Sequence, residues 1–436
     1  ETESGPALKA ATPPFGPAHG FGLYIHWPYC TRICPYCDFN VYAAKDRDNA
    51  GLNAALLGDV ARNRALLADH PPLGSVYFGG GTPSLMAAGD IASLIERADE
   101  AFGIESGAEI TLEANPADIS RGALQAWKAA GITRVSLGIQ SLDDQALSFL
   151  GRDHDSAMAR RAAEDTLAIF DNTSIDLIYA RPGQPTESWK TELSDALSLG
   201  APHLSLYELT IAERTAFGKR AERGELVPMP DDDQADLYEL TQQICEARGL
   251  PAYEISKHAA GEAYKSRHNL TYWRGGDWIG IGPGAHGRLS LDGRRFATHA
   301  PARPGDYEAA VKAPLPSEPG EPLTSLDTAR ELLALGLRPQ PRGHVEVEVD
   351  ELVGVHPLHH PREPAQQGTD LGRGAGGVGA GQPGAGGVAH HQRVDPVQRV
   401  ADLRLGAVHG VDLVADDRRR GPHRTAPRGL FASREL

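Results

Sequence analysis

Three cysteines lie within eight residues, in the pattern Cys30-x-x-x-Cys34-x-x-Cys37, directly after the apolar run 23–27. Thiolates are the usual protein ligands of iron–sulfur clusters, and a 4Fe–4S cubane that is fully bound by protein needs four of them. Three thiolates leave the fourth iron open to a ligand that is not part of the protein. The spacing therefore predicts a 4Fe–4S cluster bound through Cys30, Cys34 and Cys37, with one iron available for chemistry.

A zinc site and a disulfide are the alternatives for these cysteines. Zinc prefers four tetrahedral ligands, and the nearest candidate for the fourth, His26, adjoins Trp27 rather than belonging to a second Cys/His pair. Four cysteines in 436 residues do not make a disulfide scaffold, so the cluster is favoured. The remaining cysteine, Cys245, follows Leu237 and Ile244 at helical spacing, and we expect it to be a small buried side chain.

The overall charge limits the partners of this chain. There are 43 Lys and Arg against 58 Asp and Glu, so the formal net charge is −15. An acidic chain is poorly suited to bind a phosphate backbone, which argues against nucleic acid. We find no apolar run of membrane-spanning length, and residues 1–20 read as a flexible segment without a signal-peptide core. Few cysteines, three of them in one reducible site, predict a cytoplasmic protein.

Strand-like and helix-like segments alternate between residues 21 and 215. The predicted strands are 22–27, 75–78, 108–113, 133–138, 174–179 and 203–209. The predicted helices are 47–69, 85–102, 119–130, 155–170 and 187–198. This alternation predicts an α/β fold with a parallel sheet and helices outside it, and six units predict a partial (β/α)6 barrel. Functional residues of such barrels follow the C-terminal ends of the strands.

The sequence pattern and the composition change again beyond residue 215. We expect a barrel extension over residues 216–299, a Pro-rich linker over 300–324, and the first helix of a C-terminal domain over 325–338. Residues 339–436 hold sixteen Gly and eight of the seventeen His, but no Lys, Cys, Tyr or Trp. So few large apolar groups cannot offset the entropy of ordering. We therefore expect an aberrant tail that is either disordered or translated in a shifted reading frame.

The cysteine triplet resembles the signature of radical S-adenosylmethionine (SAM) proteins. In these proteins the amino and carboxylate groups of SAM bind the open iron, and an electron from the cluster cleaves SAM to a 5′-deoxyadenosyl radical. The resemblance implies two cofactors, a 4Fe–4S cluster and SAM, together with an electron donor. The cofactors carry the chemistry, while the protein supplies binding, orientation and exclusion of water. A partial barrel is also the common fold of these proteins.

Five residues near the cysteines are candidates for contacts with SAM. Gly80, Gly81 and Thr82 form a glycine loop after the second predicted strand. Glycine lets the backbone approach a ligand closely, although tight turns use it too, and the resemblance assigns this loop to the methionine part of SAM. Tyr24 on the first strand and Tyr36 between two cysteines can lie near the adenine, with ordinary aromatic packing as the alternative.

Four further candidates follow or lie within later strands. Glu113 ends the third strand and Gln140 the fourth, and the resemblance implies that Glu113 accepts hydrogen bonds from the amino or ribose groups of SAM. Arg152 can neutralise a carboxylate. Asp176 lies inside an otherwise apolar strand, where a charge is costly unless it is paired or functional. Each of these residues has a structural alternative, but their combination with the triplet favours a SAM site.

Longer motifs narrow the resemblance to the oxygen-independent coproporphyrinogen III oxidase group, and they occupy residues 24–28, 34–40, 79–84 and 206–210. The oxidases of this group have a longer N-terminal arm and a further cysteine two positions after the triplet, where this chain has Phe39. A second subgroup, the HemW-type haem chaperones, has the motif His-Asn-x-x-Tyr-Trp. The chain carries this motif from His268 to Trp273.

The motif implies a third ligand, haem. The resemblance assigns haem contacts to His268, Asn269, Tyr272 and Trp273, and a histidine can ligate haem iron while aromatic rings pack on the porphyrin. The alternative is that His268 and Asn269 satisfy buried backbone groups while Tyr272 and Trp273 fill a core. His286 is a second possible haem ligand.

We therefore predict a radical SAM haem chaperone, which binds haem and passes it to an acceptor haem protein of the respiratory type. The alternative is an oxygen-independent coproporphyrinogen III oxidase (dehydrogenase) of porphyrin biosynthesis. A radical enzyme acting on transfer RNA is disfavoured by the acidic charge. Two departures from the family stand out: Arg181 replaces the usual Leu, and Lys257-His258 replace the usual Asn-Phe.

Overall fold

The computed structural model describes residues 13–44, 49–67 and 70–339, and every structural statement below refers to these ranges. The predictions for residues 340–436, and for most of the N-terminal segment, lie outside the described residues. None of the described helices is long and apolar enough to cross a membrane.

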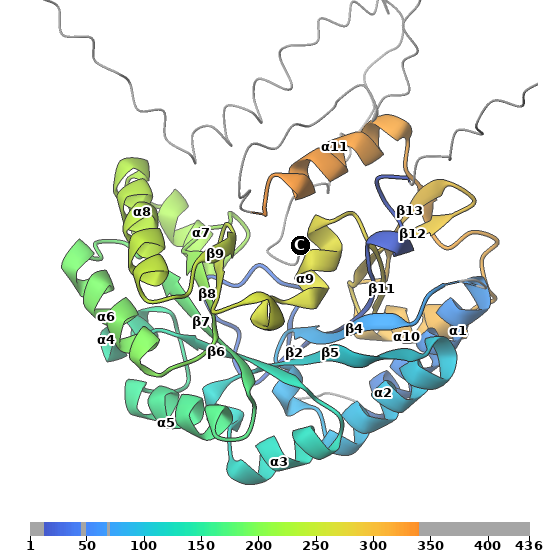
Figure 1. The fold of residues 1–436 in the computed structure, drawn as a ribbon, viewed down its shortest axis with the longest axis horizontal. Coiled ribbons are helices and arrows are strands. Elements are labelled where there is room, and N and C mark those ends of the chain that lie inside the picture. The colour runs from blue at the N-terminus through green and yellow to red at the C-terminus, as the bar shows by residue number, and fades with distance from the viewer. Residues whose placement is uncertain (1–12, 45–48, 68–69, 340–436) are drawn as a thin grey trace, which may run out of the picture. The chain divides into compact units, whose positions relative to one another are not determined.

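Twelve strands of the described chain form one mixed sheet in the order β14-β13-β12-β11-β1-β4-β5-β6-β7-β8-β10-β9. Its six central strands are parallel to one another. They are β1 (Phe21–Trp27), β4 (Leu73–Gly80), β5 (Ile104–Ala114), β6 (Arg134–Gln140), β7 (Asn172–Tyr179) and β8 (His203–Glu208). In Figure 1 these strands curve around a common interior with helices outside. The predicted α/β partial barrel with six parallel strands is confirmed.

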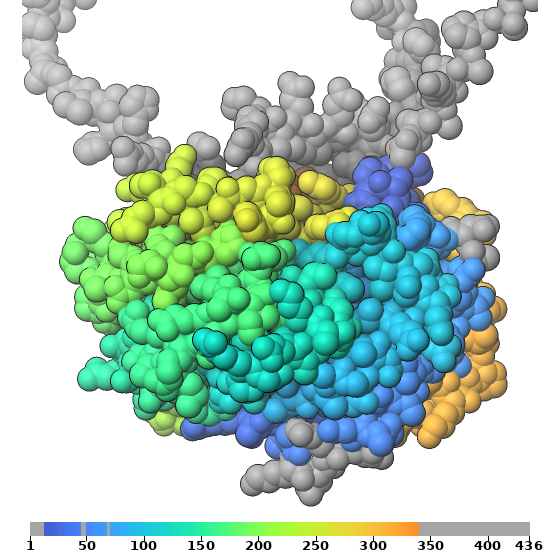
Figure 2. All heavy atoms as spheres, turned by 60° about the horizontal axis from the view of Figure 1, so that its bottom comes forward, coloured from blue at the N-terminus to red at the C-terminus, as the bar shows by residue number. Residues whose placement is uncertain are grey.

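The predicted helices of the barrel are also present. They are α1 (Asn49–Leu66), α2 (Ala88–Phe102), α3 (Arg121–Ala129), α5 (Ser156–Leu167) and α6 (Thr186–Ser198). Ser120 and Asp155 begin α3 and α5, because each side chain accepts a hydrogen bond from a backbone N–H of the first turn. When the bottom of Figure 1 is turned toward the viewer, the face is coloured mainly from blue through cyan to green, the range that includes α2, α3 and α5 (Figure 2).

Three further helices occur in the described chain, and Phe217 of one of them packs on Tyr36 of the cysteine loop. The helical spacing of Leu237, Ile244 and Cys245 agrees with α8 (Asp231–Ala247), whereas α4 (Asp144–Phe149) and α7 (Ala216–Glu222) were not predicted. The two missed helices span fewer than three turns, so their apolar periodicity is weak. Each is nevertheless capped by a side chain, Asp143 for α4 and Thr215 for α7.

The residues beyond the predicted barrel extend the same sheet at both edges. At one edge β11 (Asp277–Ile281) pairs in parallel with β1, followed by antiparallel β12 (His286–Leu291), β13 (Arg294–His299) and β14 (Glu321–Pro322). At the other edge β10 (Lys257–Ala259) and β9 (Ala252–Glu254) continue antiparallel from β8. The segment that the sequence treated as an extension therefore supplies strands at both borders of the sheet, and β14 comes from the predicted linker.

Helices also occur where the sequence predicted a linker. Helix α10 (Pro304–Lys312) lies within the Pro-rich segment. The proline is compatible with a helix here because Pro304 occupies the first helical turn, where proline is tolerated. The Pro-rich pattern of the predicted linker did not indicate this helix. Helix α11 (Ser325–Gly336) begins at the predicted residue, with Thr324 as its cap.

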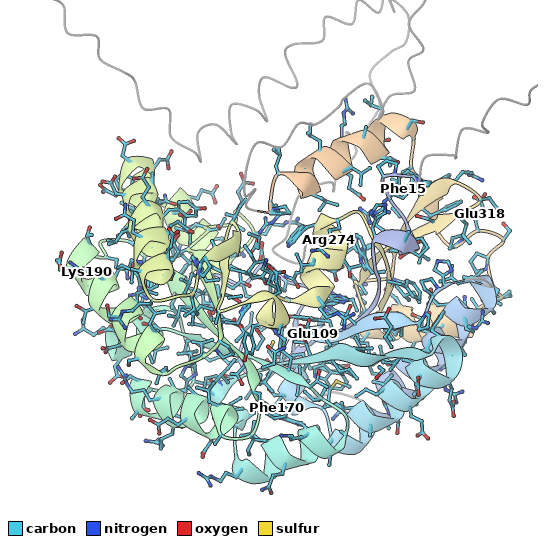
Figure 3. All side chains as sticks on the ribbon, viewed as in Figure 1. Phe15, Glu109, Phe170, Lys190, Arg274 and Glu318 are labelled. Carbon is cyan, nitrogen blue, oxygen red and sulfur yellow. The ribbon has the colours of Figure 1, made fainter. Side chains whose placement is uncertain are left out.

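The two sides of the sheet differ in polarity. Between the sheet and the outer helices lies an apolar core that includes Trp189, which is fully buried and stacks on Tyr179 at a ring-centroid distance of 4.8 Å. Buried polar side chains of the strands include Glu109, Arg134 and His203. Figure 3 shows Glu109 within the barrel, whereas Lys190 lies on the outer surface of α6.

Candidate functional site

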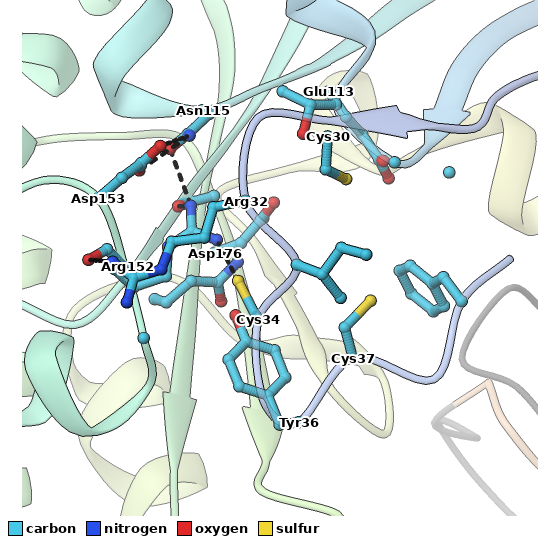
Figure 4. Close-up of a pocket in the computed structure, with 18 of the residues that line it drawn as sticks. Cys30, Arg32, Cys34, Tyr36, Cys37, Glu113, Asn115, Arg152, Asp153 and Asp176 are labelled. Atoms are coloured by element: carbon cyan, nitrogen blue, oxygen red, sulfur yellow. Dashed lines mark hydrogen bonds between the residues drawn. The ribbon is translucent and has the colours of Figure 1, made fainter. Parts of the chain in front are cut away.

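A pocket lies where the cysteine loop meets the C-terminal ends of β4 to β8 (Figure 4). It is lined by all three cysteines of the triplet and by eight of the nine predicted SAM contacts. These are Cys30, Cys34, Cys37, Tyr36, Gly80, Gly81, Thr82, Glu113, Gln140, Arg152 and Asp176. The fold thus brings together residues that are up to 146 positions apart in the sequence.

The cysteine loop is fixed by the glycine segment. The backbone N–H of Gly81 donates to the carbonyl of Trp27 at 2.7 Å, and that of Thr82 donates to Tyr29 at 2.9 Å. A Cβ on Gly81 would lie 2.9 Å from backbone atoms of Trp27, Pro28 and Tyr29. The missing side chain therefore lets the end of β4 pack directly on the backbone that leads into the cysteines.

The thiols of the described chain form no disulfide. All four cysteines of the described chain are free. Among the described residues, no three His, Cys, Asp or Glu side chains converge on a single metal ion, so the zinc alternative finds no support. The thiolates of a cubane bind three separate irons and have no need to converge on one point. Cys245 is fully buried on α8, as expected.

Arg152 places a positive charge next to the cysteines. Its Nη1 donates to Cys34 Sγ at 3.3 Å, and its Nη2 donates to Asn115 Oδ1 at 2.9 Å and to the carbonyl of Gly138 at 3.0 Å. Figure 4 shows Arg152 beside Cys34, with Asn115 hydrogen-bonded to Asp153. These contacts fix the guanidinium plane at the wall of the pocket.

Two buried polar atoms of the pocket have no hydrogen-bond partner within the described chain. One is the donor Nε of Arg152, and the other is the acceptor Oε1 of Gln140. Gln140 also has a φ of 70°, in the left-handed region that non-glycine residues rarely adopt. Buried polar groups are normally paired, so an orphaned donor and an orphaned acceptor in one pocket indicate a polar ligand with both functions.

Two of the predicted SAM contacts are carboxylates that line the same pocket. Glu113 Oε1 accepts a hydrogen bond from the Tyr77 hydroxyl at 2.7 Å. Asp176 accepts from Ser136 and from Ser174, each at 2.8 Å, which explains how an acidic side chain is tolerated in an apolar strand. With Arg152, the pocket offers separated negative and positive groups. This donor set fits SAM, which carries a sulfonium, an ammonium and a carboxylate.

The structure does not bring Tyr24 to this pocket. Its hydroxyl lies 3.1 Å from His26 Nδ1, and its ring packs with Tyr77 and with Tyr272. The predicted contact between Tyr24 and adenine is therefore not supported. Strand alternation explains the difference, because successive side chains of β1 point to opposite faces and the side chain of Tyr24 joins a packed cluster. Tyr36 does line the pocket, and its ring also packs on Phe217 of α7.

The His-Asn-x-x-Tyr-Trp motif forms helix α9 (Arg267–Trp273) and is mostly buried. His268, Tyr272 and Trp273 are 1%, 4% and 3% exposed. Both ring nitrogens of His268 are hydrogen-bonded, Nδ1 to Ser75 Oγ at 2.8 Å and Nε2 to Tyr272 Oη at 2.6 Å. Burial and the charge of Lys257 lower the pKa of His268 to about 3. This arrangement matches the packing alternative for the motif and presents no open imidazole to haem iron.

The other candidates near the motif also have defined surroundings. Asn269 Oδ1 accepts from Ser266 Oγ at 3.1 Å, at the cap of α9. His286 is exposed and lies next to His299 on the paired strands β12 and β13, with ring centroids 4.3 Å apart. It therefore does not line the pocket of the cysteines.

Several lining residues were missed from the sequence. Asn115, Ser136, Asp153 and Tyr207 also face the pocket. Ser136 carries a usable signal, since it lies near the C-terminal end of the predicted strand 133–138, where functional residues of such barrels are expected. Asn115 and Asp153 come from loops whose positions follow only from the packed barrel.

The comparison with known proteins agrees with this geometry. The radical SAM superfamily model matches residues 24–196. "Radical S-adenosyl methionine domain-containing protein 1, mitochondrial" of Dictyostelium discoideum is 38% identical over 357 residues, which cover 72% of this chain and 80% of that protein. "Heme chaperone HemW" of Mycobacterium tuberculosis is 38% identical over 290 residues, or 63% of this chain and 71% of the relative.

Another haem chaperone and one solved structure are also similar to this chain. "Heme chaperone HemW" of Escherichia coli is 37% identical over 289 residues, covering 65% of this chain and 75% of the relative. Among solved structures, the radical SAM coproporphyrinogen III oxidase HemN of Escherichia coli matches with a TM-score of 0.60 and 21% identity, over 73% of this chain and 75% of the other. That likeness shows the fold alone.

These findings define a radical SAM protein by fold and by superfamily match. Within that class, the chain belongs to the HemW-type family. Membership in the radical SAM superfamily implies a 4Fe–4S cluster and SAM as cofactors.

Proposed function

We propose that this chain is a haem chaperone that binds a 4Fe–4S cluster and SAM, holds haem, and transfers it to an acceptor haem protein. The observation that carries the proposal is the single pocket lined by the cysteine triplet and the SAM candidates. Identities of 37–38% to proteins named heme chaperone support the haem function. An oxygen-independent coproporphyrinogen III oxidase is the outcome that the experiments below must exclude.

We assign the cluster to Cys30, Cys34 and Cys37. When bound, the cluster and SAM supply an electron-transfer centre and a source of the adenosyl radical. Arg152 Nε is assigned to the SAM carboxylate, because a guanidinium binds a carboxylate with charge-assisted hydrogen bonds. Gln140 Oε1 and the carboxylate of Glu113 are assigned to its amino group.

The remaining residues shape the site. Gly80, Gly81 and Thr82 bring backbone close to the methionine part of SAM, while Tyr36 borders the adenine. Asp176 adds a negative charge near the sulfonium or the ribose hydroxyls. The presence of these residues in the lining of the pocket, the chemistry of each group and the family resemblance support these roles.

Contact between haem and the His-Asn-x-x-Tyr-Trp motif requires part of the protein to move. His268, Asn269, Tyr272 and Trp273 remain the candidates from the sequence, but Trp273 is covered by Arg338, whose guanidinium carbon lies 4.5 Å from the indole centroid. Leu335 of α11 packs in the same cluster. Haem that touches these residues would therefore have to displace the C-terminal end of α11.

The partners follow from the same proposal. The acceptor is a respiratory type of haem protein, and an electron donor keeps the cluster reduced. We place the protein in the cytoplasm of a cell with a reducing interior, while noting that the relatives include both mitochondrial and bacterial proteins.

Anaerobic reconstitution tests the function directly. The full chain, loaded with iron and sulfide, is titrated with haem and followed by absorption spectroscopy, and the loaded protein is then mixed with an apo haem protein. We expect saturable haem binding and transfer. Incubation with coproporphyrinogen III, SAM and a reductant should give no vinyl-bearing product, and such a product would establish the oxidase instead.

The cysteine assignment gives a second test. Cys30→Ala, Cys34→Ala and Cys37→Ala should each abolish the cluster, since two thiolates do not hold a cubane stably. Cys245→Ala is the matched control, because this thiol is fully buried on α8 away from the pocket. Iron and sulfide content after reconstitution measures the result, and loss of iron in the control alone would contradict the assignment.

A further inference from the structure

Helix α9 packs against β1, β4 and β11 (Figure 1). The imidazole of His268 is fixed from two sides, by Ser75 of β4 and by Tyr272 one turn along the helix. Because both ring nitrogens are engaged, iron can bind neither without breaking a buried hydrogen bond. The fixed ring instead provides a rigid face for its neighbours.

The neighbours of this ring are two tyrosines. The Tyr77 ring lies 5.1 Å from the His268 ring, with 24° between their planes. It also lies 6.2 Å from the Tyr24 ring at 27°, and the Tyr24 and His268 rings are 6.3 Å apart at 27°. Three nearly parallel rings therefore contact one another, and this packing restricts the orientation of Tyr77.

Two glycines make room for these rings. A Cβ on Gly22 would lie 2.8 Å from Ser75 Oγ and 3.0 Å from His268 Nδ1. A Cβ on Gly79 would lie 2.9 Å from the Tyr24 ring and 3.0 Å from the Tyr77 ring. Side chains are thus missing at both positions where they would collide with the stack. This indicates that the ring arrangement is built into β1 and β4.

Tyr77 connects the rings to the pocket. Its hydroxyl donates to Glu113 Oε1 at 2.7 Å, and Glu113 lines the pocket with the cysteines. Burial and the charge of Glu113 raise the pKa of Tyr77 well above its usual value of 10, so the phenol keeps its proton at neutral pH. One oxygen of Glu113 is therefore held in place by a permanent donor.

We propose that His268 is a positioning residue of the SAM pocket, which holds Tyr77 where the tyrosine hydroxyl orients Glu113. The inference rests on the proposed function, because it takes SAM as the ligand of the pocket. This role gives His268, the first residue of the His-Asn-x-x-Tyr-Trp motif, a function in SAM binding rather than in iron ligation. A ligand that displaces α9 would then weaken SAM binding, since the two sites share one set of contacts.

The test measures the dissociation constant of SAM for the anaerobically reconstituted full chain, without reductant, so that SAM is not consumed. Tyr77→Phe and His268→Gln should each weaken binding roughly tenfold, as expected for a hydrogen bond to a charged group. Iron content should stay unchanged. The double variant should bind no more weakly than Tyr77→Phe, because His268 acts through the hydroxyl that this substitution removes.

Two further variants keep the test decisive. Ser75→Ala removes the hydrogen bond to His268 Nδ1 and should weaken SAM binding by a smaller factor, which carries the test if His268→Gln does not fold. His258→Gln is the matched control, since this buried histidine bonds the carbonyl of Leu250 and belongs to β10, which is not a neighbour of β4 in the sheet, and SAM affinity should not change.

The opposite results would overturn the inference. These are unchanged SAM affinity in Tyr77→Phe or His268→Gln, additive losses in the double variant, or a His268→Gln variant that loses haem binding and keeps SAM affinity. A wild-type chain that assembles the cluster but does not bind SAM would instead contradict the proposed function, so the two failures are distinguishable.

Discussion

Arg181 shows how a buried charged residue is compensated by its neighbours. Its side chain is 6% exposed, and its Nη2 donates to Glu192 Oε2 on α6 at 2.6 Å. Its Nη1 donates to the carbonyl of Ile178 at 2.8 Å. Glu192 also accepts from the Ser141 hydroxyl and from the backbone N–H of Leu142. The buried charges are thus paired and hydrogen-bonded, as burial requires.

Breaking this pair should destabilise the fold. Arg181→Leu leaves the Glu192 carboxylate buried without its cation, and we expect a loss of about 3 kcal/mol in the free energy of unfolding. Urea denaturation of the metal-free chain measures it. Arg181→Leu combined with Glu192→Gln should recover most of the loss, because the amide keeps an acceptor and removes the charge. Equal stability of wild type and Arg181→Leu would contradict this account.

Among the elements, α10 is tied to the barrel through α1. Tyr307 of α10 is 1% exposed, and its hydroxyl donates to Asp59 Oδ2 on α1 at 2.9 Å. Asp59 is partly buried and also accepts from Asn63 at 3.2 Å, while Arg62 lies nearby. Burial raises the pKa of Asp59 to about 6, although Tyr307 and Arg62 favour the charged form. The α1–α10 contact therefore holds a carboxylate in an unfavourable setting at neutral pH.

Neutralising this carboxyl should stabilise the contact. A carboxyl whose pKa is higher in the folded than in the unfolded chain favours folding in acid, and this contribution is lost as the pH rises through 6. Asp59→Asn keeps an acceptor for Tyr307 and should raise the free energy of unfolding by about 1–2 kcal/mol at pH 7.5. The gain should shrink by pH 5. Thermal unfolding at both values measures it, and an equal gain at both would rule out titration of Asp59 as the cause.

Across the whole molecule, the barrel buries histidines in their neutral form. Burial lowers the pKa of His258 to about 4 and that of His268 to about 3, and it lowers the pKa of His203 well below its usual value. His203 lies between Ser174 and Tyr253, with hydrogen bonds of 2.8 and 2.9 Å. The unfolded chain binds protons at these residues below about pH 6.5, whereas the folded chain does not.

Stability should therefore fall steeply in acid. Each of these histidines contributes stability above about pH 6.5 that is lost at roughly 1.4 kcal/mol per pH unit as the pH falls below it. The urea midpoint should be clearly lower at pH 5.5 than at 7.5, despite the smaller opposite effect of Asp59. His258→Gln should reduce this pH dependence of stability by the contribution of a single histidine side chain. An unchanged urea midpoint between pH 5.5 and 7.5 would show that folding does not lower the pKa values of these histidines.

Local patterns were sufficient for most of the fold. The six parallel strands and the helices between them follow from apolar spacing and capping residues that lie within a few positions of each other, such as Ser120 before α3. The pairing of β11 with β1 was not predictable, because it joins residues more than 250 positions apart. Nor was α10 predictable, since the prolines of residues 300–322 suggested a linker, and the place of Pro304 in a first helical turn is seen only in the structure.

The sequence by itself determined the cysteine triplet and the polar residues at the strand ends, because in a parallel barrel every such end meets the same edge. Only the tertiary structure decided the positions of Tyr24 and His268. Their side chains belong to a ring stack that needs Tyr77 of β4, helix α9 some 190 residues later, and two glycines that leave room for it. Which face of a strand is covered, and by what, depends on packing between distant segments, and no local pattern encodes it.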